Sequence, residues 1–284
     1  MRVLVTGAAG QLGGAIVRAF APSSTVIGMT RHDLDITVEA DVMRAARDVS
    51  PQVIVNCSAY NAVDQAEDDP GEALEANAFG VLALARAARE SRAVLIHFGT
   101  DFVFNGEAAA PYRETDAPGP RSNYGVSKLL GEWFAADAPS HYVLRVESLF
   151  GGERAKSSVD RILDGIRRGE TVRVFVDRTV TPSYVDDVAA ATMRLIDVRP
   201  ACGLYHCVNS GVTTWLGIAE EAARLMRREA SLERVSVDSV KLRARRPKYC
   251  ALSNEKLRLA GIEMPTWQEA LARHIRKSSG ITNP

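Results

Sequence analysis

The chain has 284 residues, a length that suits one large domain or two smaller ones. Hydrophobic residues make up 46% and charged residues 25% of the sequence, as in ordinary globular proteins, which excludes a disordered or fibrous protein. Lys and Arg together number 35, and so do Asp and Glu, so the formal net charge is zero. A neutral chain has no overall attraction to nucleic acid or to an anionic membrane, so any anion must be bound by a local site.

No targeting or membrane-spanning segment is recognisable. The apolar start MRVLV runs directly into a glycine turn, without the basic and apolar regions of a signal peptide. No run approaches the ~18 apolar residues that a membrane helix needs. Cys57, Cys202, Cys207 and Cys250 form no C-x-x-C pair, and their neighbours are typical of strands. We expect a cytoplasmic protein with four reduced, mostly buried thiols.

Short β-branched runs alternate with Ala-, Leu- and Arg-rich stretches through the first half of the chain. The runs predict strands at 2–6, 25–30, 52–56, 93–98 and 141–146. The stretches between them predict helices at 11–20, 38–49, 71–89 and 124–135. Apolar strands that alternate with helices predict an α/β fold, a Rossmann-type doubly wound parallel sheet covered on both faces.

After residue 150 the alternation of predicted strands and helices becomes less regular. It predicts a helix at 160–168, a strand at 172–176, a helix at 181–196 capped by Ser183 or Thr181, and a strand at 203–209. Residues 211–284 are rich in helix-forming residues. We therefore expect an NAD(P)-binding Rossmann domain at 1–150, joined by returning segments at about 181–210. Residues 151–180 and 211–284 are expected to form a smaller, discontinuous C-terminal substrate-binding lobe.

A glycine-rich turn follows the first predicted strand directly. Gly7, Gly10 and Gly13 are spaced G-x-x-G-x-x-G and open the first predicted helix. Such glycines allow a tight turn, a close approach of the backbone to a pyrophosphate, and close packing of helix on strand. Free N–H groups at the helix start receive the anion. The turn therefore predicts dinucleotide contacts at Gly7, Gly10, Gln11, Leu12 and Gly13.

The residues after the second predicted strand bear on the choice of cofactor. Arg31 and His32 follow this strand, with no Asp or Glu at its tip. An acid there would hydrogen-bond a ribose 2′-hydroxyl and repel a 2′-phosphate, whereas a guanidinium does the reverse. Arg31 therefore favours NADPH over NADH, although NADH stays possible. Asp35 and Ile36 are expected to flank the adenine ring.

A Tyr/Lys pair at the start of a predicted helix has the spacing of a catalytic pair. Tyr124 and Lys128 are four residues apart, so both side chains lie on one helix face. A nearby ammonium lowers the pKa of a phenol and would let the tyrosine exchange a proton near neutral pH. Thr100 follows an apolar strand at the carboxyl edge of the sheet, where open α/β sheets bind ligands.

Several segments together carry a resemblance to a known family: TGAAGQLG, VNCSAYNAVDQAE, GTDFVFNG, PYRETD, NYGVSKLLGE, GLYHCVNSGVTTW and ARRPKYCALSNEKL. They resemble the extended short-chain dehydrogenase/reductases, and among these the dTDP-4-dehydrorhamnose reductase family. The resemblance covers essentially the whole chain and is more specific than the glycine turn or the Tyr/Lys pair alone. It implies NADPH-dependent reduction of the keto group of a nucleotide-linked deoxyketosugar.

The resemblance also implies roles for individual residues. Tyr124 would protonate the keto oxygen while NADPH delivers hydride to the carbon. Lys128 would hold the nicotinamide ribose hydroxyls and lower the tyrosine pKa, and Thr100 would orient the carbonyl. Further cofactor contacts are implied at Cys57, Ser58, Ala59 and Tyr60. Substrate contacts are implied at Val63, Asp64, Thr100, Asp101, Phe102 and Tyr124.

Several positions depart from the family's pattern where the sugar should sit. Gly99 replaces the usual Ser before the catalytic Thr, and Ser148, beside Glu147, stands where an aromatic residue is usual. Arg178 and Val180 stand where the family often has Gln and Gly. With Glu147 and Ser148 as substrate contacts, these changes predict a wider pocket and a ketosugar more polar than, or substituted differently from, dTDP-4-dehydrorhamnose. Alternatively, Glu147 pairs with an arginine away from the pocket and Ser148 only fills space.

Two further features concern charged ligands. The basic run at 241–248 is either a solvated charged face or a clamp for the substrate's diphosphate, with Arg246 as the best candidate. It is short and lacks interleaved aromatic residues, which disfavours nucleic acid. Some family members carry a Glu on the first helix that ligates magnesium between subunits. The matching position is Ala15, so we expect no metal.

Two other functional classes stay open. One is an epimerase or dehydratase of the same superfamily, which would retain NAD(P) and recycle it. A dehydratase needs an acid beside the catalytic Thr, and Asp101 has that place, but the Glu that should follow is Phe102. The other is a non-catalytic NADP-binding regulatory subunit, against which the intact Thr/Tyr/Lys set argues. We expect a nucleotide-sugar ligand, no nucleic-acid or membrane partner, and a monomer or homodimer.

Overall fold

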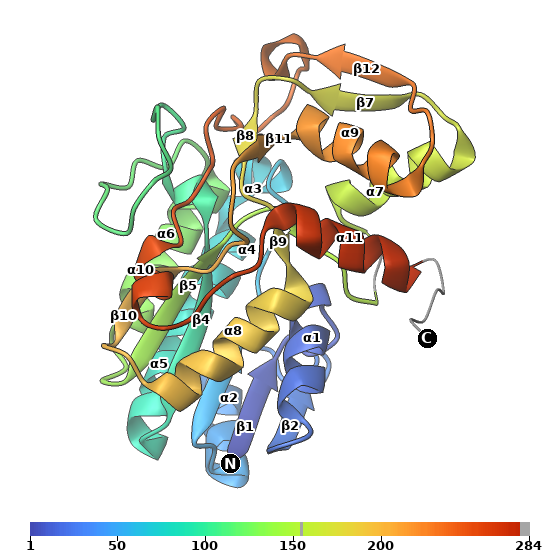
Figure 1. Cartoon of the computed structure of the whole chain (residues 1–284). Helices are drawn as coiled ribbons and strands as arrows, with labels where there is room; N and C mark the ends of the chain where they lie inside the picture. The colour runs from blue at the N-terminus through green and yellow to red at the C-terminus, as the bar shows by residue number, and fades with distance from the viewer. Residues whose placement is uncertain (154–155, 279–284) are drawn as a thin grey trace.

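The centre of the molecule is a six-stranded parallel sheet (Figure 1). The computed structural model describes residues 1–153 and 156–278. The strand order is β10-β5-β4-β3-β1-β2, so the order reverses between β1 and β3. The strands are β1 (Arg2–Thr6), β2 (Thr25–Met29), β3 (Val53–Asn56), β4 (Val94–Thr100), β5 (His141–Val146) and β10 (Gly203–His206). This architecture confirms the predicted α/β, Rossmann-type fold.

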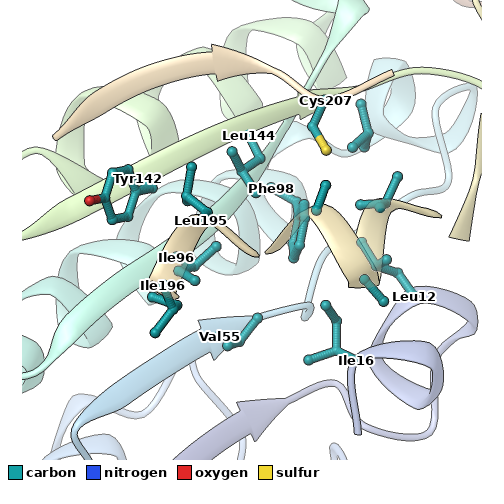
Figure 2. Close-up of a cluster of buried hydrophobic side chains, with 14 of the residues drawn as sticks. Leu12, Ile16, Val55, Ile96, Phe98, Tyr142, Leu144, Leu195, Ile196 and Cys207 are labelled. Carbon is teal, nitrogen blue, oxygen red and sulfur yellow. The ribbon is translucent and has the colours of Figure 1, made fainter. Parts of the chain in front are cut away.

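Helices cover both faces of the sheet, as its apolar strands require. One face carries α1 (Gln11–Phe20) and α8 (Val185–Val198), which lie side by side in Figure 1. Figure 2 shows Leu12 and Ile16 of α1 and Leu195 of α8 pointing at Ile96 and other strand side chains in this core. The opposite face carries α2 (Glu39–Val49), α5 (Gly80–Ser91) and α6 (Asn123–Ala135), whose alanines pack closely on the strands.

A separate hydrophobic cluster holds the later elements together, at the upper right of Figure 1. Its elements are β7 (Val172–Phe175), which pairs in parallel with β12 (Leu232–Val235), α7 (Ser158–Arg168), α9 (Trp215–Met226) and α11 (Trp267–Ser278). Ile162, Trp215 and Leu271 are among its buried members. The region around α10 (Glu255–Leu259) behaves differently, because Leu257 and Met264 pack on the sheet's core. The division of the chain into two domains remains a prediction.

Two predicted helices begin or run differently from the prediction. The one at 71–89 is split into α4 (Pro70–Leu74), a π-helical turn η1 (Glu75–Phe79) and α5. The helix predicted at 181–196 begins only at Val185, and no side chain caps it, so the predicted cap was wrong. The preceding residues form short strands instead: β8 (Thr179–Val180) pairs with β11 (Thr213–Thr214), and β9 (Ser183–Tyr184) pairs with β6 (Leu149–Phe150).

Short elements complete the chain: α3 (Gln65–Asp68) and the 3₁₀ turns η2 (Asp101–Val103) and η3 (Val237–Ser239). Within residues 1–153 and 156–278, no helix combines the length and apolar character needed to cross a membrane. All four cysteines are free thiols: Cys207 and Cys250 are buried, Cys57 is half-buried and Cys202 is exposed.

A buried ion pair joins α6 to β5 beneath the sheet's carboxyl edge. Arg145 donates to both carboxylate oxygens of Glu132, at 2.7 to 3.1 Å, and both side chains are about 95% buried. A Cβ atom on Gly99 would lie 2.3 Å from Glu132 Oε1 and 3.0 Å from Arg145 Cγ. The ion pair therefore occupies the space that a side chain at position 99 would need.

We predict that Glu132→Gln lowers the free energy of unfolding by about 3–5 kcal/mol, because it leaves the Arg145 guanidinium charged and buried without its carboxylate. The matched control is Glu39→Gln, which breaks a 2.9 Å ion pair with Arg86 in which both side chains are half exposed. That change should cost no more than about 1 kcal/mol. Urea denaturation of the two variants measures both values, and equal losses would contradict the prediction.

Candidate active site

Two adjoining cavities run along the carboxyl ends of the strands, over the point where the strand order reverses. Open α/β sheets bind ligands at this switch point. The first cavity has a volume of about 570 Å³ and the second about 460 Å³. They share Gly10, Cys57, Ser58, Ala59 and Asn61 and so form one groove.

The turn between β1 and α1 forms the floor of the groove. Gly7 has a φ of +65°, and a Cβ there would lie 2.7 Å from the backbone of Cys57 and Ser58. The Gly10 N–H donates to the Gly7 carbonyl at 2.8 Å, and α1 begins without a side-chain cap. Its first N–H groups therefore stay available to an anion at the positive end of the helix. This backbone cradle fits the pyrophosphate of a dinucleotide.

Gly13 has a different role from the other two glycines. A Cβ there would lie 2.2 Å from the Gly7 carbonyl oxygen, so α1 can pack on the turn only without a side chain at 13. Gly7 and Gly10 line the groove together with Gln11 and Leu12. The side-chain amide of Gln11 donates to the Gly151 carbonyl at 2.7 Å, which ties the turn to the segment after β6.

Residues after β2 surround the far end of the first cavity. Arg31, Asp35 and Ile36 all line it, and Arg31 is exposed. The Asp35 carboxylate accepts hydrogen bonds from the Thr37 N–H at 3.0 Å and the Thr37 hydroxyl at 2.8 Å. These bonds lower the pKa of Asp35, with the charge of Arg31 contributing. Asp35 therefore carries a negative charge, stabilises its own loop through Thr37, and lies near the exposed Arg31 guanidinium.

Two asparagines that the sequence analysis did not single out shape the loop after β3. Asn56 Oδ1 accepts from the Thr6 hydroxyl at 2.8 Å and from the Ser58 N–H at 3.0 Å. Asn77, in the π-helical turn, accepts from the Tyr60 N–H at 2.9 Å and donates to the Tyr60 carbonyl at 3.0 Å. π-Helical turns are frequent at functional sites. These bonds hold Cys57, Ser58, Ala59 and Tyr60 along the first cavity.

Tyr124 and Lys128 project from the first turns of α6 into the second cavity, together with Thr100. The Ser122 hydroxyl caps α6 by accepting from the Gly125 N–H at 3.1 Å. The Lys128 ammonium donates to the Phe98 carbonyl at 2.6 Å, and the Tyr124 hydroxyl donates to Asn61 Oδ1 at 3.4 Å. The structure thus brings the three predicted catalytic side chains to one wall of the cavity.

The pKa of Tyr124 differs from the prediction. Burial raises the pKa of its phenol, the negative charge of Asp101 raises it further, and hydrogen bonding with Thr100 offsets only part of the effect. The expected lowering was therefore wrong for the protein alone. Burial also lowers the pKa of Lys128 to about 8, against the opposing charge of Glu132. At neutral pH the site holds a protonated phenol, which can act as an acid.

The second cavity extends toward the later elements of the chain. Val63, Asp101 and Phe102 line it, as predicted substrate contacts. Ser148 also lines it, in a left-handed conformation with φ +45°. Glu147 points elsewhere: its carboxylate accepts from the Thr181 N–H and hydroxyl, both at 2.6 Å. Arg178, one of the departures from the family pattern, lines it too, and so do Ser157, Ser158 and Trp215, which the prediction did not include.

The predicted contacts Asp64 and Arg246 are bonded to each other rather than lining the second cavity. Arg246 donates to Asp64 Oδ2 at 2.7 Å, and the Ala244 N–H donates to Oδ1 at 2.9 Å. Arg243 in the same loop pairs with Asp68. Arg246 also stacks over the Phe102 ring at 5.8 Å and lines a separate cavity of about 260 Å³. The basic loop is therefore fastened to both ends of α3, at Asp64 before its first residue and at Asp68, its last.

Comparisons with known proteins identify the relatives of this chain. The family model described as "RmlD substrate binding domain" matches residues 1–279. The dTDP-4-dehydrorhamnose reductase of Sinorhizobium fredii is 33% identical over 97% of both chains. A probable dTDP-4,6-dihydroxy-2-methyloxan-3-one 4-ketoreductase of Streptomyces antibioticus is 35% identical over 95% of this chain and 93% of its own. The crystal structure of a dTDP-4-dehydrorhamnose reductase from Bacillus anthracis in complex with NADP superposes with a TM-score of 0.93 at 30% identity, covering 97% of this chain and 99% of its own.

Proposed function

The chain belongs to the dTDP-4-dehydrorhamnose reductase family of extended short-chain dehydrogenase/reductases, and from this premise we propose that it reduces the keto group of a nucleotide-linked deoxyketosugar with NADPH. The observation that carries the proposal is the continuity of the groove. A cradle suited to a dinucleotide opens directly into a cavity that holds Thr100, Tyr124 and Lys128. A sugar carbonyl in this second cavity would lie between the catalytic side chains and the cofactor.

Each catalytic side chain has a role that its surroundings support. NADPH, when bound, supplies the hydride. Tyr124 gives its proton to the keto oxygen, and its raised pKa keeps it protonated until that oxygen becomes more basic. Thr100 orients the carbonyl through its hydroxyl. Lys128, anchored on the Phe98 carbonyl, holds the nicotinamide ribose.

Cofactor binding is proposed for the residues along the first cavity and the turn. The contacts are Gly7, Gly10, Gln11, Leu12, Arg31, Asp35, Ile36 and the Cys57–Tyr60 loop, with Gly13 acting through helix packing. A cytoplasmic location and a monomer or homodimer remain predictions. The bonded state of Asp64 and Arg246 favours a loop-fastening role for them over direct substrate contact.

A dehydratase is less well supported than a reductase. Glu147 does lie beside Asp101, although it comes from a different strand end. However, its carboxylate is bonded to Thr181 and does not line the cavity, so it cannot reach a sugar proton. The pocket instead offers Ser148 and Arg178 to the sugar, which supports a ketosugar with more polar substituents than dTDP-4-dehydrorhamnose.

We predict that Tyr124→Phe lowers kcat by ~10²–10⁴, because it removes the proton donor and keeps the ring's packing. Lys128→Met should lower both kcat and the affinity for NADPH. The control is Tyr142→Phe, which removes the hydroxyl of another buried tyrosine, bonded to the Pro200 carbonyl at 2.8 Å far from the groove. The assay follows NADPH oxidation with an accepted ketosugar. Near-normal turnover by Tyr124→Phe would exclude Tyr124 as the proton donor.

We predict that NADPH binds more tightly than NADH by about 1–3 kcal/mol, the value of a hydrogen bond to a charged group. Arg31→Ala should remove this preference and leave NADH affinity unchanged, whereas Arg44→Ala, on the exposed side of α2, should change neither. Calorimetric titration of both cofactors provides the measurement. Equal affinities in the unmodified protein would show that Arg31 does not meet the 2′-phosphate.

We predict that, among nucleotide ketosugars, substrates with additional polar groups have the highest kcat/KM. A less polar sugar would leave polar groups of the pocket without hydrogen-bond partners, which lowers its kcat/KM. Ser148→Trp should shift the preference toward dTDP-4-dehydrorhamnose by roughly tenfold or more. Ser50→Trp is the control, since Ser50 has the same φ of +45° far from the groove. If dTDP-4-dehydrorhamnose is already the best substrate and Ser148→Trp changes nothing, the pocket argument fails.

A further inference from the structure

The outer side of α6 carries no exposed charge, although this helix lies at the surface of the chain. Its charged residues, Lys128 and Glu132, are buried and bond to β4 and β5. On the outer side, Val126 is 41% and Trp133 is 60% exposed. A surface helix usually turns charged residues to water, whereas a helix that is apolar all round is buried. The composition of α6 therefore indicates that its outer side is covered.

The apolar surface continues from α6 onto the neighbouring helix. Phe79, the last residue of η1, is 49% exposed, and its ring stacks on the Phe134 ring with 6.0 Å between the centroids. Along α6, Leu130 lies one turn from Val126 and from Trp133, so the three side chains share one face. α5 packs beside α6, and both are labelled in Figure 1. We define the α5–α6 face as Phe79, Leu82, Val126, Leu130, Trp133 and Phe134, all exposed or half-buried.

Other exposed apolar residues of the described chain are scattered. Single residues of this kind are normal on the surface of a monomer. A contact that joined the α5–α6 face to a different surface of the next copy would need a second apolar patch. The remaining large apolar residues that are more than a third exposed each lie on a different segment: Met1, Val38, Val176, Val198, Val212 and Leu259. The α5–α6 face is therefore better matched to itself than to these positions.

The charges next to the α5–α6 face are balanced within one chain. Arg86 donates to both carboxylate oxygens of Glu39, and Arg89 donates to Asp137 at 2.6 Å. Glu75 lines the first cavity instead. A two-fold axis brings identical surfaces together, so unbalanced charges would repel their own copies. Because the face has an uncharged centre and neutral ion pairs beside it, a second copy can approach without this repulsion.

The size of the face suits a small homodimer. α6 has 13 residues and α5 has 12, so each is about 18–20 Å long, and two helices side by side are about 20 Å wide. The accessible surface of the side chains over this area approaches the ~800 Å² that each partner of a standard interface buries. We propose that the chain forms a two-fold symmetric homodimer through its α5–α6 face. The proposal does not depend on the reaction.

The interface lies behind the catalytic side of α6. Tyr124 and Lys128 project from this helix into the second cavity, whereas Val126, Leu130 and Trp133 point away from the sheet. A second copy would therefore support α6 on the side away from the reacting groups. Trp133 is the expected anchor, because tryptophan is prominent among the residues that dominate binding energy at interfaces.

Trp133→Glu tests the interface through the mass of the protein. Light scattering during gel filtration should give twice 30.8 kDa for the unmodified chain at micromolar concentration. The variant should give 30.8 kDa, because dimerisation would bury two unpaired carboxylates and weaken by about a hundredfold or more. It should fold, since Trp133 is largely exposed and glutamate is a good helix former. The matched control is Leu259→Glu, which changes a 72% exposed residue of α10 and should leave the dimer intact.

Tryptophan fluorescence shows which surface is covered. The chain has three tryptophans, and Trp215 and Trp267 are only 8% and 6% exposed, so Trp133 is the accessible one. The dimer should protect Trp133 from acrylamide, and quenching should increase when the protein is diluted. Val126→Glu keeps all three tryptophans and should leave Trp133 accessible at every concentration.

The possible results separate a second copy from other ways of covering the face. A mass of 30.8 kDa at every concentration, with Trp133 freely quenched, would overturn the proposal and leave the face to a different partner. A dimer that persists in both Trp133→Glu and Val126→Glu would contradict it too, because another surface would then join the copies. Oligomers larger than a dimer would show a head-to-tail contact in place of the two-fold one. Loss of the dimer in these two variants but not in Leu259→Glu, together with protection of Trp133, would establish the interface.

Discussion

The close approach of the β1–α1 turn to the loop after β3 is the constraint on which the site depends. At the switch point of the sheet, the Gly7 backbone passes so near Cys57 and Ser58 that no Cβ fits between them. Gly13 removes the second obstacle, because α1 then packs directly on the Gly7 carbonyl. With both glycines in place, the uncapped start of α1 opens into the groove, and every later element of the site is positioned around this cradle.

Much of this architecture could be predicted because its signals are local. Apolar strands, helical periodicity, glycine spacing and the four-residue interval of Tyr124 and Lys128 each lie within one short segment. The start of α8 was misjudged because Ser183 and Tyr184 pair with β6, a contact made across more than thirty residues. Propensity favoured a capped helix there, and strand pairing with a distant segment prevailed over it.

The site residues that the sequence analysis missed also depend on distant contacts. Asn77 holds the Tyr60 loop from a π-helical turn that no periodicity indicates. Trp215 reaches the second cavity only because the later elements fold back over the sheet edge. Arg246 and Asp64 each looked like a ligand contact in isolation, whereas their mutual ion pair becomes apparent only when the two segments lie together. A contact between segments that are far apart in the sequence leaves no recognisable pattern within either segment.

The departures from the family pattern form connected groups in the structure. Gly99 lies against the buried Glu132–Arg145 pair, and Glu147 binds Thr181 while it faces Asp101 and Arg178. A carboxyl buried at 147 is tolerable only if its charge is compensated or its proton is kept, and Arg178 can compensate one of the two nearby carboxylates. The second carboxyl must then carry a proton at neutral pH. Asp101 in turn bonds to Thr100, so Glu147 lies one residue away from the catalytic threonine although it does not itself line the cavity.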